Sequence, residues 1–286
     1  MISKLVPHHM LSVIKSEKRQ VDEFDNDLTL LYTDLGGINN FSKGVRDPRE
    51  VVIFLQKLFS RFDQLCDENK VYKVHTVGNK YVVMGYNGRI DKSRRNKAVI
   101  VDEAIRVIKT GLEMLDIIKE TREQHHHASA TELNLRIGIH TGKVFAGIIG
   151  SKVVRYDIFG EGVLYTNKIE QNGLVDQCCV SEETRNLILR NPDIARGLTF
   201  ELHKKIHLEQ INKSTSIYKV EKSLDSQGNL FDSDASSHEI SSDESGSVIE
   251  EGEYGIYPPQ LHTHIDTDRS IQEQSEDSSM LVSNQK

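Results

Sequence analysis

The amino-acid sequence predicts an α+β fold in which helices cover an antiparallel sheet. Three observations support this class: an apolar run of strand length at 28–34, a capped amphipathic helix that begins at Asp47, and a hairpin signal at Gly78-Asn79. Apolar residues at helical spacing and short β-rich runs then alternate to about residue 222. No internal repeat is apparent, so we expect one mixed domain.

The first strand and the first long helix are separated by a pair of glycines. Leu28–Asp34 is apolar and ends in a carboxylate, and Gly36-Gly37 follows it as a strand-to-loop signal. Asp47-Pro48-Arg49-Glu50 then supplies an N-cap, a proline at the first helical position and a glutamate in the first turn. The helix is expected to run to about Asn69. Its buried stripe consists of Val51, Phe54, Leu55, Leu58, Phe62 and Leu65.

The elements that follow complete the alternation. Residues 71–77 and 81–86 are β-rich and flank Gly78-Asn79, which predicts a hairpin. The apolar face of a second amphipathic helix contains Val101, Ala104, Ile105, Ile108, Leu112 and Leu115. The later strands are expected at 133–140, 144–149, 154–159, 177–180, 198–202 and 217–220, and the later helices at 162–171 and 181–189.

Charge is distributed unevenly along the chain. Residues 223–286 contain 14 acidic and two basic residues, a net charge of −12, whereas residues 1–222 carry 34 basic and 29 acidic residues, or +5. A mildly basic body suits an anionic substrate but is far from the charge of a nucleic-acid-binding protein. Ser, Asp, Glu and Gly dominate the last segment, which cannot bury enough apolar surface to fold. We therefore predict a helical lead-in at 1–26, a folded domain at 27–222 and a disordered, acidic, Ser-rich tail at 223–286.

The cysteines and the hydropathy indicate the compartment. Cys66, Cys178 and Cys179 are an odd set without CxxC or zinc spacing, which favours a reducing cytosol. No 18-residue apolar run and no signal peptide are present, so no membrane segment is expected in this chain. We expect a cytoplasmic domain, or one at the cytoplasmic face of a membrane if it belongs to a larger protein.

Five stretches, in this order and spacing, resemble the catalytic domain of class III nucleotide cyclases. They are LLYTDLGGINNFS (30–42), LFSRFDQLCDENKVYKVHTVGNKYVVMG (58–85), LNLRIGIHTGKVFAGIIGS (133–151), RYDIFGEGV (155–163) and NKIEQNG (167–173). The style is most similar to the paired cyclase domains of protist guanylate and adenylate cyclases. The resemblance implies a ferredoxin-like antiparallel sheet with flanking helices. It also implies cyclisation of ATP or GTP with loss of pyrophosphate, Mg²⁺ or Mn²⁺ as cofactor, and a second cyclase domain paired head to tail.

The resemblance places the metal-binding positions at Asp34 and Asn79, and the loop that faces the triphosphate at Gly36 and Gly37. Asp34 either ligates a metal ion or caps the following turn. The family has an aspartate where this chain has Asn79, whose neutral amide oxygen is a weaker ligand. Asn79 is therefore either a weakened ligand or a residue of the hairpin turn.

The remaining family positions also depart from the usual pattern. The resemblance places the purine-selecting positions at His75 and Asp157; Asp157 alone favours ATP, whereas His75 can donate or accept a hydrogen bond and decides nothing. Each of these two residues faces either the substrate or a degenerate pocket. The asparagine and arginine that stabilise the transition state correspond to Leu164 and Lys168, so Lys168 is either catalytic or a solvated surface charge. The resemblance gives Lys143 a possible phosphate contact.

Three functions remain open on this evidence. The chain is a cyclase subunit that completes its site with a partner domain, a pseudo-cyclase that regulates or dimerises without turnover, or a nucleotide sensor. Arg136 and His140 are expected to be structural. The run His125–His127 lacks metal-ligand spacing, so we expect no zinc site there.

Overall fold

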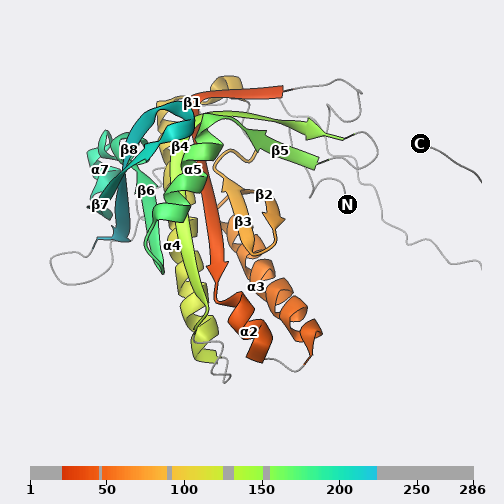
Figure 1. Cartoon of the computed structure of the whole chain (residues 1–286). Helices are drawn as coiled ribbons and strands as arrows, with labels where there is room; N and C mark the ends of the chain where they lie inside the picture. The colour runs from red at the N-terminus through yellow and green to blue at the C-terminus, as the bar shows by residue number, and fades with distance from the viewer. Residues whose placement is uncertain (1–20, 45–46, 89–91, 125–131, 151–154, 224–286) are drawn as a thin grey trace, which may run out of the picture. The chain divides into compact units, whose positions relative to one another are not determined.

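The computed structural model describes residues 21–44, 47–88, 92–124, 132–150 and 155–223 (Figure 1). The predicted tail from residue 224 onward, residues 1–20 of the predicted lead-in, and His125–His127 lie outside these residues.

An eight-stranded sheet forms the centre of the described residues. Its path is β2-β3-β1-β4-β6-β8-β7, and β5 pairs with β4. The strands are β1 (Val21–Gly36), β2 (Tyr72–Val77), β3 (Lys80–Met84), β4 (Asn134–Ile149), β5 (Arg155–Phe159), β6 (Gln177–Ser181), β7 (Leu198–Leu208) and β8 (Lys213–Lys222). The α+β prediction is confirmed, with one difference. Strands β4 and β6 are parallel, because the chain crosses from one to the other through a helix, whereas the other pairs are antiparallel.

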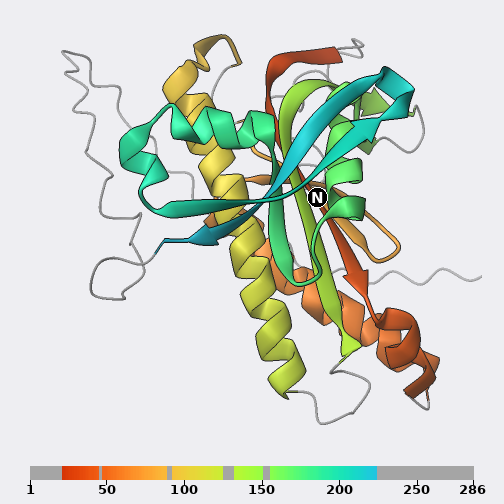
Figure 2. The ribbon, with the colours of Figure 1, turned by 60° about the vertical axis from the view of Figure 1, so that its left-hand side comes forward.

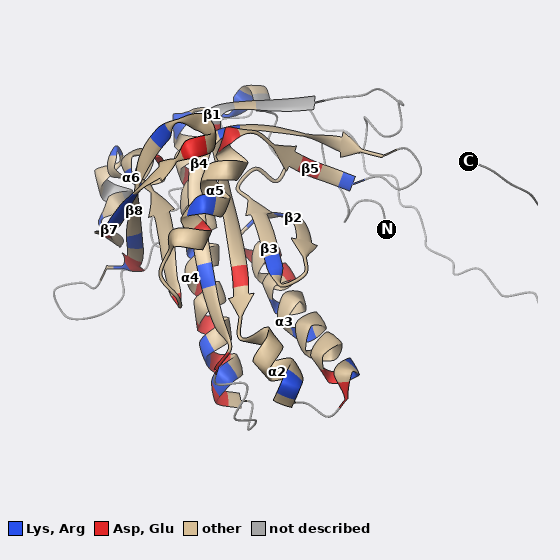
Figure 3. Cartoon of the chain, viewed as in Figure 1, with Lys and Arg blue, Asp and Glu red and all other residues tan. Residues whose placement is uncertain are grey.

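Helices cover both faces of this sheet (Figure 2). They are α2 (Ile38–Gly44), α3 (Pro48–Glu68), α4 (Lys97–Gln124), α5 (Glu161–Asn172), α6 (Glu182–Leu189) and α7 (Pro192–Ala195), with 3-10 turns η3 (Lys92–Arg94) and η5 (Glu209–Ile211). Helix α3 starts as predicted, with Pro48 at its first turn and the Asp47 side chain accepting a hydrogen bond from the Arg49 amide. Basic and acidic residues are interspersed along α4 rather than segregated (Figure 3).

The alternation of side chains along β1 determines on which face of the sheet Asp34 lies. Leu31 and Leu35 are fully buried in the core that contains α3 and α4. Leu30 lies in a second core on the opposite face, against which Tyr32 packs. Because residues two apart share a face of a strand, Asp34 lies on the same face as Leu30 and Tyr32.

Three strand boundaries differ from the predictions. Residues 21–26 belong to β1, not to a helix. The two strands expected at 133–140 and 144–149 are one strand, β4, because the irregularity lies in β1 between Phe24 and Leu28 while β4 continues past it. Strands β7 and β8 extend beyond their predicted cores, since polar residues at the sheet edge continue the ladder.

Helix α5 lies unusually close to β4. A Cβ atom added at Gly138 would be 2.2 Å from the backbone nitrogen of Glu170, so only glycine fits there. This close approach brings the Glu170 side chain down onto the sheet.

Candidate functional site

Asp34 lies where β1 meets its neighbours at one end of the sheet. The strand register pairs it with Lys80 on β3 and with Arg136 on β4. Its Oδ2 atom accepts a hydrogen bond from Arg136 Nη2 at 2.6 Å, and its Oδ1 accepts one from Asn79 Nδ2 at 2.6 Å. The side chain of Asp34 is only 17% exposed. Both carboxylate oxygens are therefore occupied by donors from the same chain.

Glu170 on α5 extends this arrangement into a network of charges. It is fully buried and accepts hydrogen bonds from Arg136 Nε at 3.1 Å and from Lys80 Nζ at 2.8 Å. Burial alone would lower the pKa of Arg136, but its hydrogen bonds to Asp34 and Glu170 outweigh burial and raise that pKa. Two carboxylates thus balance two cations, which is the condition for keeping a buried charge ionised.

Asn79 takes part in this network as a hydrogen-bond donor. Its amide nitrogen contacts the carboxylate of Asp34 and also the carbonyl oxygen of Leu35, at 2.8 Å. Because both neighbours can only accept, the NH₂ group must face them and the amide oxygen must point elsewhere. Asn79 follows Gly78, whose φ of 61° places it in the hairpin turn. The sequence left open whether Asn79 is a ligand or a turn residue, and the geometry favours the turn.

These residues do not fit a pair of divalent ions. Mg²⁺ and Mn²⁺ favour several carboxylate or carbonyl oxygens. At this end of the sheet Asp34 already accepts two hydrogen bonds, and Glu170 is held by Arg136 and Lys80. Among the residues that the structure describes, no group of three potential metal ligands stands together. We therefore assign no step to a metal ion held by this chain.

The glycine pair after Asp34 is required by close contacts. A Cβ at Gly36 would lie 2.2 Å from Asn134 Oδ1, and one at Gly37 would lie 2.2 Å from the carbonyl oxygen of Glu132. Gly37 also has a φ of 78°, which an L-residue adopts rarely. The tight turn leads directly into α2, next to the Asp34 network.

The two predicted purine-selecting residues lie close together although 82 positions separate them. His75 Nδ1 is 3.3 Å from Asp157 Oδ1, but this nitrogen is buried and makes no hydrogen bond of acceptable geometry with the described residues. Asp157 is further held by the guanidinium of Arg155 and by the amide of Ile158. Burial lowers the pKa of His75; Asp157 opposes this shift and Arg155 adds to it. The imidazole is therefore neutral at pH 7.

The transition-state positions lie on one face of α5. Leu164 is 41% exposed, and Lys168 is partly exposed one turn further along. An exposed leucine offers no side-chain hydrogen bond at the first position, and Lys168 carries a positive charge at the second.

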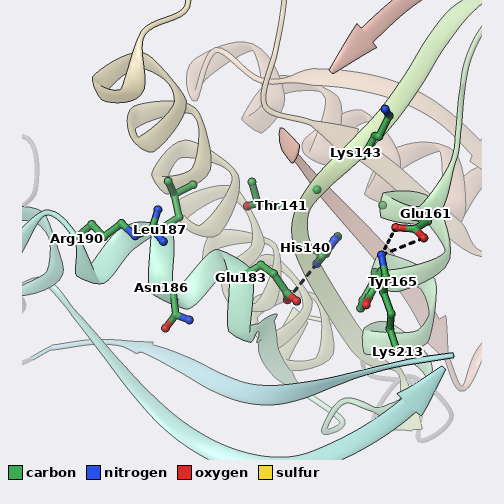
Figure 4. A pocket seen from close by; sticks show the side chains of 12 residues that line it. His140, Thr141, Lys143, Glu161, Tyr165, Glu183, Asn186, Leu187, Arg190 and Lys213 are labelled. Carbon is green, nitrogen blue, oxygen red and sulfur yellow. Dashed lines mark hydrogen bonds and ion pairs between the residues drawn. The ribbon is translucent and has the colours of Figure 1, made fainter. Parts of the chain in front are cut away.

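Lys143 lies apart from Asp34. It is seven residues beyond Arg136 on β4, which corresponds to about 23 Å along a strand. There it lines a cavity of about 390 Å³ at the start of α5 (Figure 4). The cavity also contains His140, stacked on Tyr165 at 4.5 Å, and the ion pair between Glu161 and Lys213. The structure does not bring Lys143 to the predicted site.

The basic residue that the fold does bring to Asp34 is Arg136, which the sequence analysis regarded as structural. Lys80, Glu170 and Arg155 were not singled out as site residues either. Their roles depend on strand register and on the approach of α5. The sequence signal that could have found Arg155 is its two-residue spacing from Asp157, which places both on one face of a strand.

Comparison with known families identifies the class of this domain. The family of adenylate and guanylate cyclase catalytic domains matches residues 20–222, and the chain belongs to that family. Guanylate cyclase alpha of Plasmodium falciparum (isolate 3D7) is 34% identical over 190 residues, which cover 66% of this chain and 4% of that protein. The membrane guanylyl cyclase of Dictyostelium discoideum is 32% identical over 189 residues, or 66% of this chain and 12% of that protein. The predicted resemblance to protist cyclases is confirmed, and the chain spans only a small part of these relatives.

Solved structures of cyclases share the fold. The guanylate cyclase domain of RhGC from Catenaria anguillulae, in complex with GTP, has a TM-score of 0.57 at 18% identity, covering 71% of this chain and 100% of that chain. The adenylyl cyclase CyaB from P. aeruginosa has a TM-score of 0.58 at 19% identity, covering 72% and 97%. Within the described residues, no helix is long and apolar enough to cross a membrane.

Proposed function

We propose that this chain is one half of a composite nucleotide cyclase that forms a 3′,5′-cyclic nucleotide for intracellular signalling. In this reaction the ribose 3′-oxygen of a nucleoside triphosphate loses its proton and bonds to the α-phosphorus, and pyrophosphate leaves. Membership of the cyclase family supports the reaction. One of the matched structures, the guanylyl cyclase domain of the RhoGC fusion protein from Blastocladiella emersonii, is a non-canonical dimer, which supports the capacity of such domains to pair.

The catalytic groups that this chain has and those that it lacks suggest which groups each of the two domains contributes to the site. The turn at Gly36 and Gly37 places backbone amides beside Asp34, suited to an anionic triphosphate. Arg136, whose Nε and Nη2 already donate to Glu170 and Asp34, adds positive charge at the same end of the sheet. Leu164 cannot donate a hydrogen bond to the transition state, and Lys168 lacks the fork of an arginine. In this proposal the partner domain supplies the transition-state asparagine and arginine and the carboxylates that hold Mg²⁺ or Mn²⁺, whose chemistry is to activate the 3′-oxygen and neutralise the phosphates.

We propose GTP as the nucleotide. Asp157 was expected to favour adenine because a free carboxylate accepts from its amino group, but in the structure this carboxylate holds the guanidinium of Arg155. The Arg155 side chain is 59% exposed and so keeps donors for a ligand. Guanine presents two adjacent acceptors, O6 and N7, which a guanidinium matches, whereas adenine has a donor at that edge. The matched relatives from Plasmodium and Dictyostelium are named guanylate cyclases, which agrees with this choice.

The GTP proposal is tested by titrating the chain with GTP and with ATP. We expect GTP to bind about tenfold more tightly, a preference worth about 1.4 kcal/mol, and Arg155→Ala to abolish it. Arg94→Ala, at an exposed arginine of η3, is the matched control and should keep the preference. An unchanged GTP-to-ATP ratio in Arg155→Ala would exclude Arg155 as the reading group.

The division of labour is tested with a restored variant that carries Asn79→Asp, Leu164→Asn and Lys168→Arg. Cyclic GMP formation by the wild-type chain, by the restored chain and by a mixture of both is measured with Mg²⁺ and with Mn²⁺. We expect a silent wild type and an active restored chain. Silence of the restored chain in every pairing would contradict the composite site, and rapid turnover by the wild type alone would contradict its incompleteness.

A regulatory half without turnover is the second candidate. The observation that favours it is the engagement of both Asp34 oxygens by Asn79 and Arg136. The mixture separates the two candidates through the variant Arg155→Ala in the unrestored partner, because Arg155 is exposed and is the group proposed to read the base. If Arg155→Ala lowers turnover of the mixture, the chain contributes to the site; if turnover is unchanged, it acts by pairing alone.

A further inference from the structure

We infer that Asn79 takes the structural place of a divalent cation, so that the Asp34 end of this domain is closed and held together without metal. The inference concerns the same site as the proposed function, but it is tested on the chain alone, without nucleotide, partner or turnover.

The contacts of Asn79 resemble those of a bound cation. Asn79 Nδ2 connects two oxygens on β1, the Asp34 carboxylate at 2.6 Å and the Leu35 carbonyl at 2.8 Å. A divalent ion bridges oxygens in the same way, by presenting positive charge to lone pairs. The backbone adds a further tie, because the Leu35 amide donates to the carbonyl oxygen of Asn79 at 3.1 Å. Three hydrogen bonds therefore fasten the β2–β3 turn to the end of β1.

The charges around Asp34 are already balanced. Asp34 and Glu170 carry two negative charges, and Arg136 and Lys80 carry two positive charges. Each carboxylate already contacts a cation, and Glu170 is fully buried between its two. A metal ion entering here would have to displace Arg136 from Asp34 and would add two positive charges to a balanced network. The existing charges therefore disfavour a bound cation, whichever atoms would coordinate it.

Replacing the Asn79 amide nitrogen by an oxygen would reverse its contact with Asp34. An aspartate at position 79 would put a carboxylate oxygen where Nδ2 now lies, 2.6 Å from the Asp34 oxygen. Two carboxylates at that distance repel each other unless a proton or a cation lies between them. Asn79→Asp should thus destabilise the turn. The same substitution should create a site that a bound divalent ion stabilises.

The experiment measures Mn²⁺ binding by calorimetry and the melting temperature in EDTA and in excess Mn²⁺. The wild type should show no saturable Mn²⁺ binding that depends on Asp34, which a parallel titration of Asp34→Asn checks. Its melting temperature should be the same in EDTA and in excess Mn²⁺. Asn79→Asp should melt lower in EDTA, recover with Mn²⁺, and bind Mn²⁺ at least about tenfold more tightly than the wild type. Asn79→Ala removes the donors without adding charge, so it should melt lower in both conditions.

Asn96→Asp is the matched control. Asn96 accepts a hydrogen bond from the Val99 amide at the start of α4, a role that aspartate fills equally well. It adds the same charge away from the network and should leave both readouts unchanged. Saturable Mn²⁺ binding by the wild type that depends on Asp34, or no gain of binding in Asn79→Asp, would overturn the inference. The wild-type titration decides the matter even if Asn79→Asp does not fold. Failure of the composite-site proposal would appear instead in the turnover of the mixtures.

Discussion

At one end of α5, Glu170 is fully buried between Arg136 and Lys80, whereas at the other end Glu161 lies at the rim of a cavity and pairs with the exposed Lys213. The first end is a closed network in which each charge has an opposite charge beside it. The second end surrounds a cavity of about 390 Å³. Buried charges therefore link β1, β3, β4 and α5 at the Asp34 end, whereas the charged pair at the cavity end is exposed to solvent.

The largest expected effect comes from opening the closed end. Arg136→Met removes the guanidinium that contacts both Asp34 and Glu170, leaving the buried Glu170 with Lys80 alone. We expect the free energy of unfolding to fall by about 3 kcal/mol, because one partner of a buried charge is removed while another remains. Urea denaturation measures this loss.

An exposed arginine–glutamate pair is the control for this change. Arg61 Nη2 lies 2.5 Å from Glu120 Oε2, with side chains 41% and 52% exposed. Arg61→Met should cost less than about 1 kcal/mol, since exposed pairs are weak. Equal losses for both variants would show that the Asp34 network is no more stabilising than a surface pair.

His140, at the base of the cavity, should make stability depend on pH. Burial lowers the pKa of His140 from 6.5 to about 3 in the folded chain. Between these values the unfolded chain binds more protons than the folded one, so stability falls as the pH drops from 6.5 towards 3. His140 also donates to or accepts from Ser181 Oγ at 2.9 Å, and Glu183 lies 3.7 Å away.

The measurement is the unfolding free energy at several pH values for the wild type and His140→Gln. The wild type should lose up to about 1.4 kcal/mol more per pH unit than the variant within this window. Only the difference in slope is compared, because the substitution also changes the buried hydrogen bond to Ser181 at every pH. Parallel pH profiles would mean that His140 is protonated in the folded chain.

The smallest effect is expected for Lys143→Met at the rim of the cavity. Because Lys143 lines the cavity at the start of α5 and lies apart from the Asp34 network, nucleotide affinity should change by less than about twofold. Arg136→Lys, which keeps the charge but loses the fork, should weaken binding more. A large loss of affinity in Lys143→Met would restore the phosphate role that the family resemblance gave it.

Sequence predictions were accurate for features that depend on nearby residues and failed for features that depend on residues distant in the sequence. The start of α3 depends on Asp47 and Pro48, which act within one helical turn, and it was predicted to the residue. The hairpin depends on Gly78 alone adopting a positive φ, and it was also predicted. The split of β4 was wrong, because the irregular pairing near Thr141 belongs to β1, more than a hundred residues away.

The candidate site shows the same limit. The sequence could place Asp34 and Asn79 at corresponding family positions, but not reveal that the amide nitrogen faces the carboxylate. It could pair His75 with Asp157 by resemblance, but the contact of Arg155 with Asp157 depends on side-chain geometry at the end of β5.

The sequence by itself determined the α+β class, the cyclase ancestry and the positions at which this chain departs from its family, because those features are encoded in local pattern and in residue identity. Only the tertiary structure placed Arg136, rather than Lys143, beside Asp34, and turned the amide nitrogen of Asn79 towards that carboxylate. Both outcomes depend on which strands lie side by side and in what register, and register is fixed by the packing of the whole sheet against its helices.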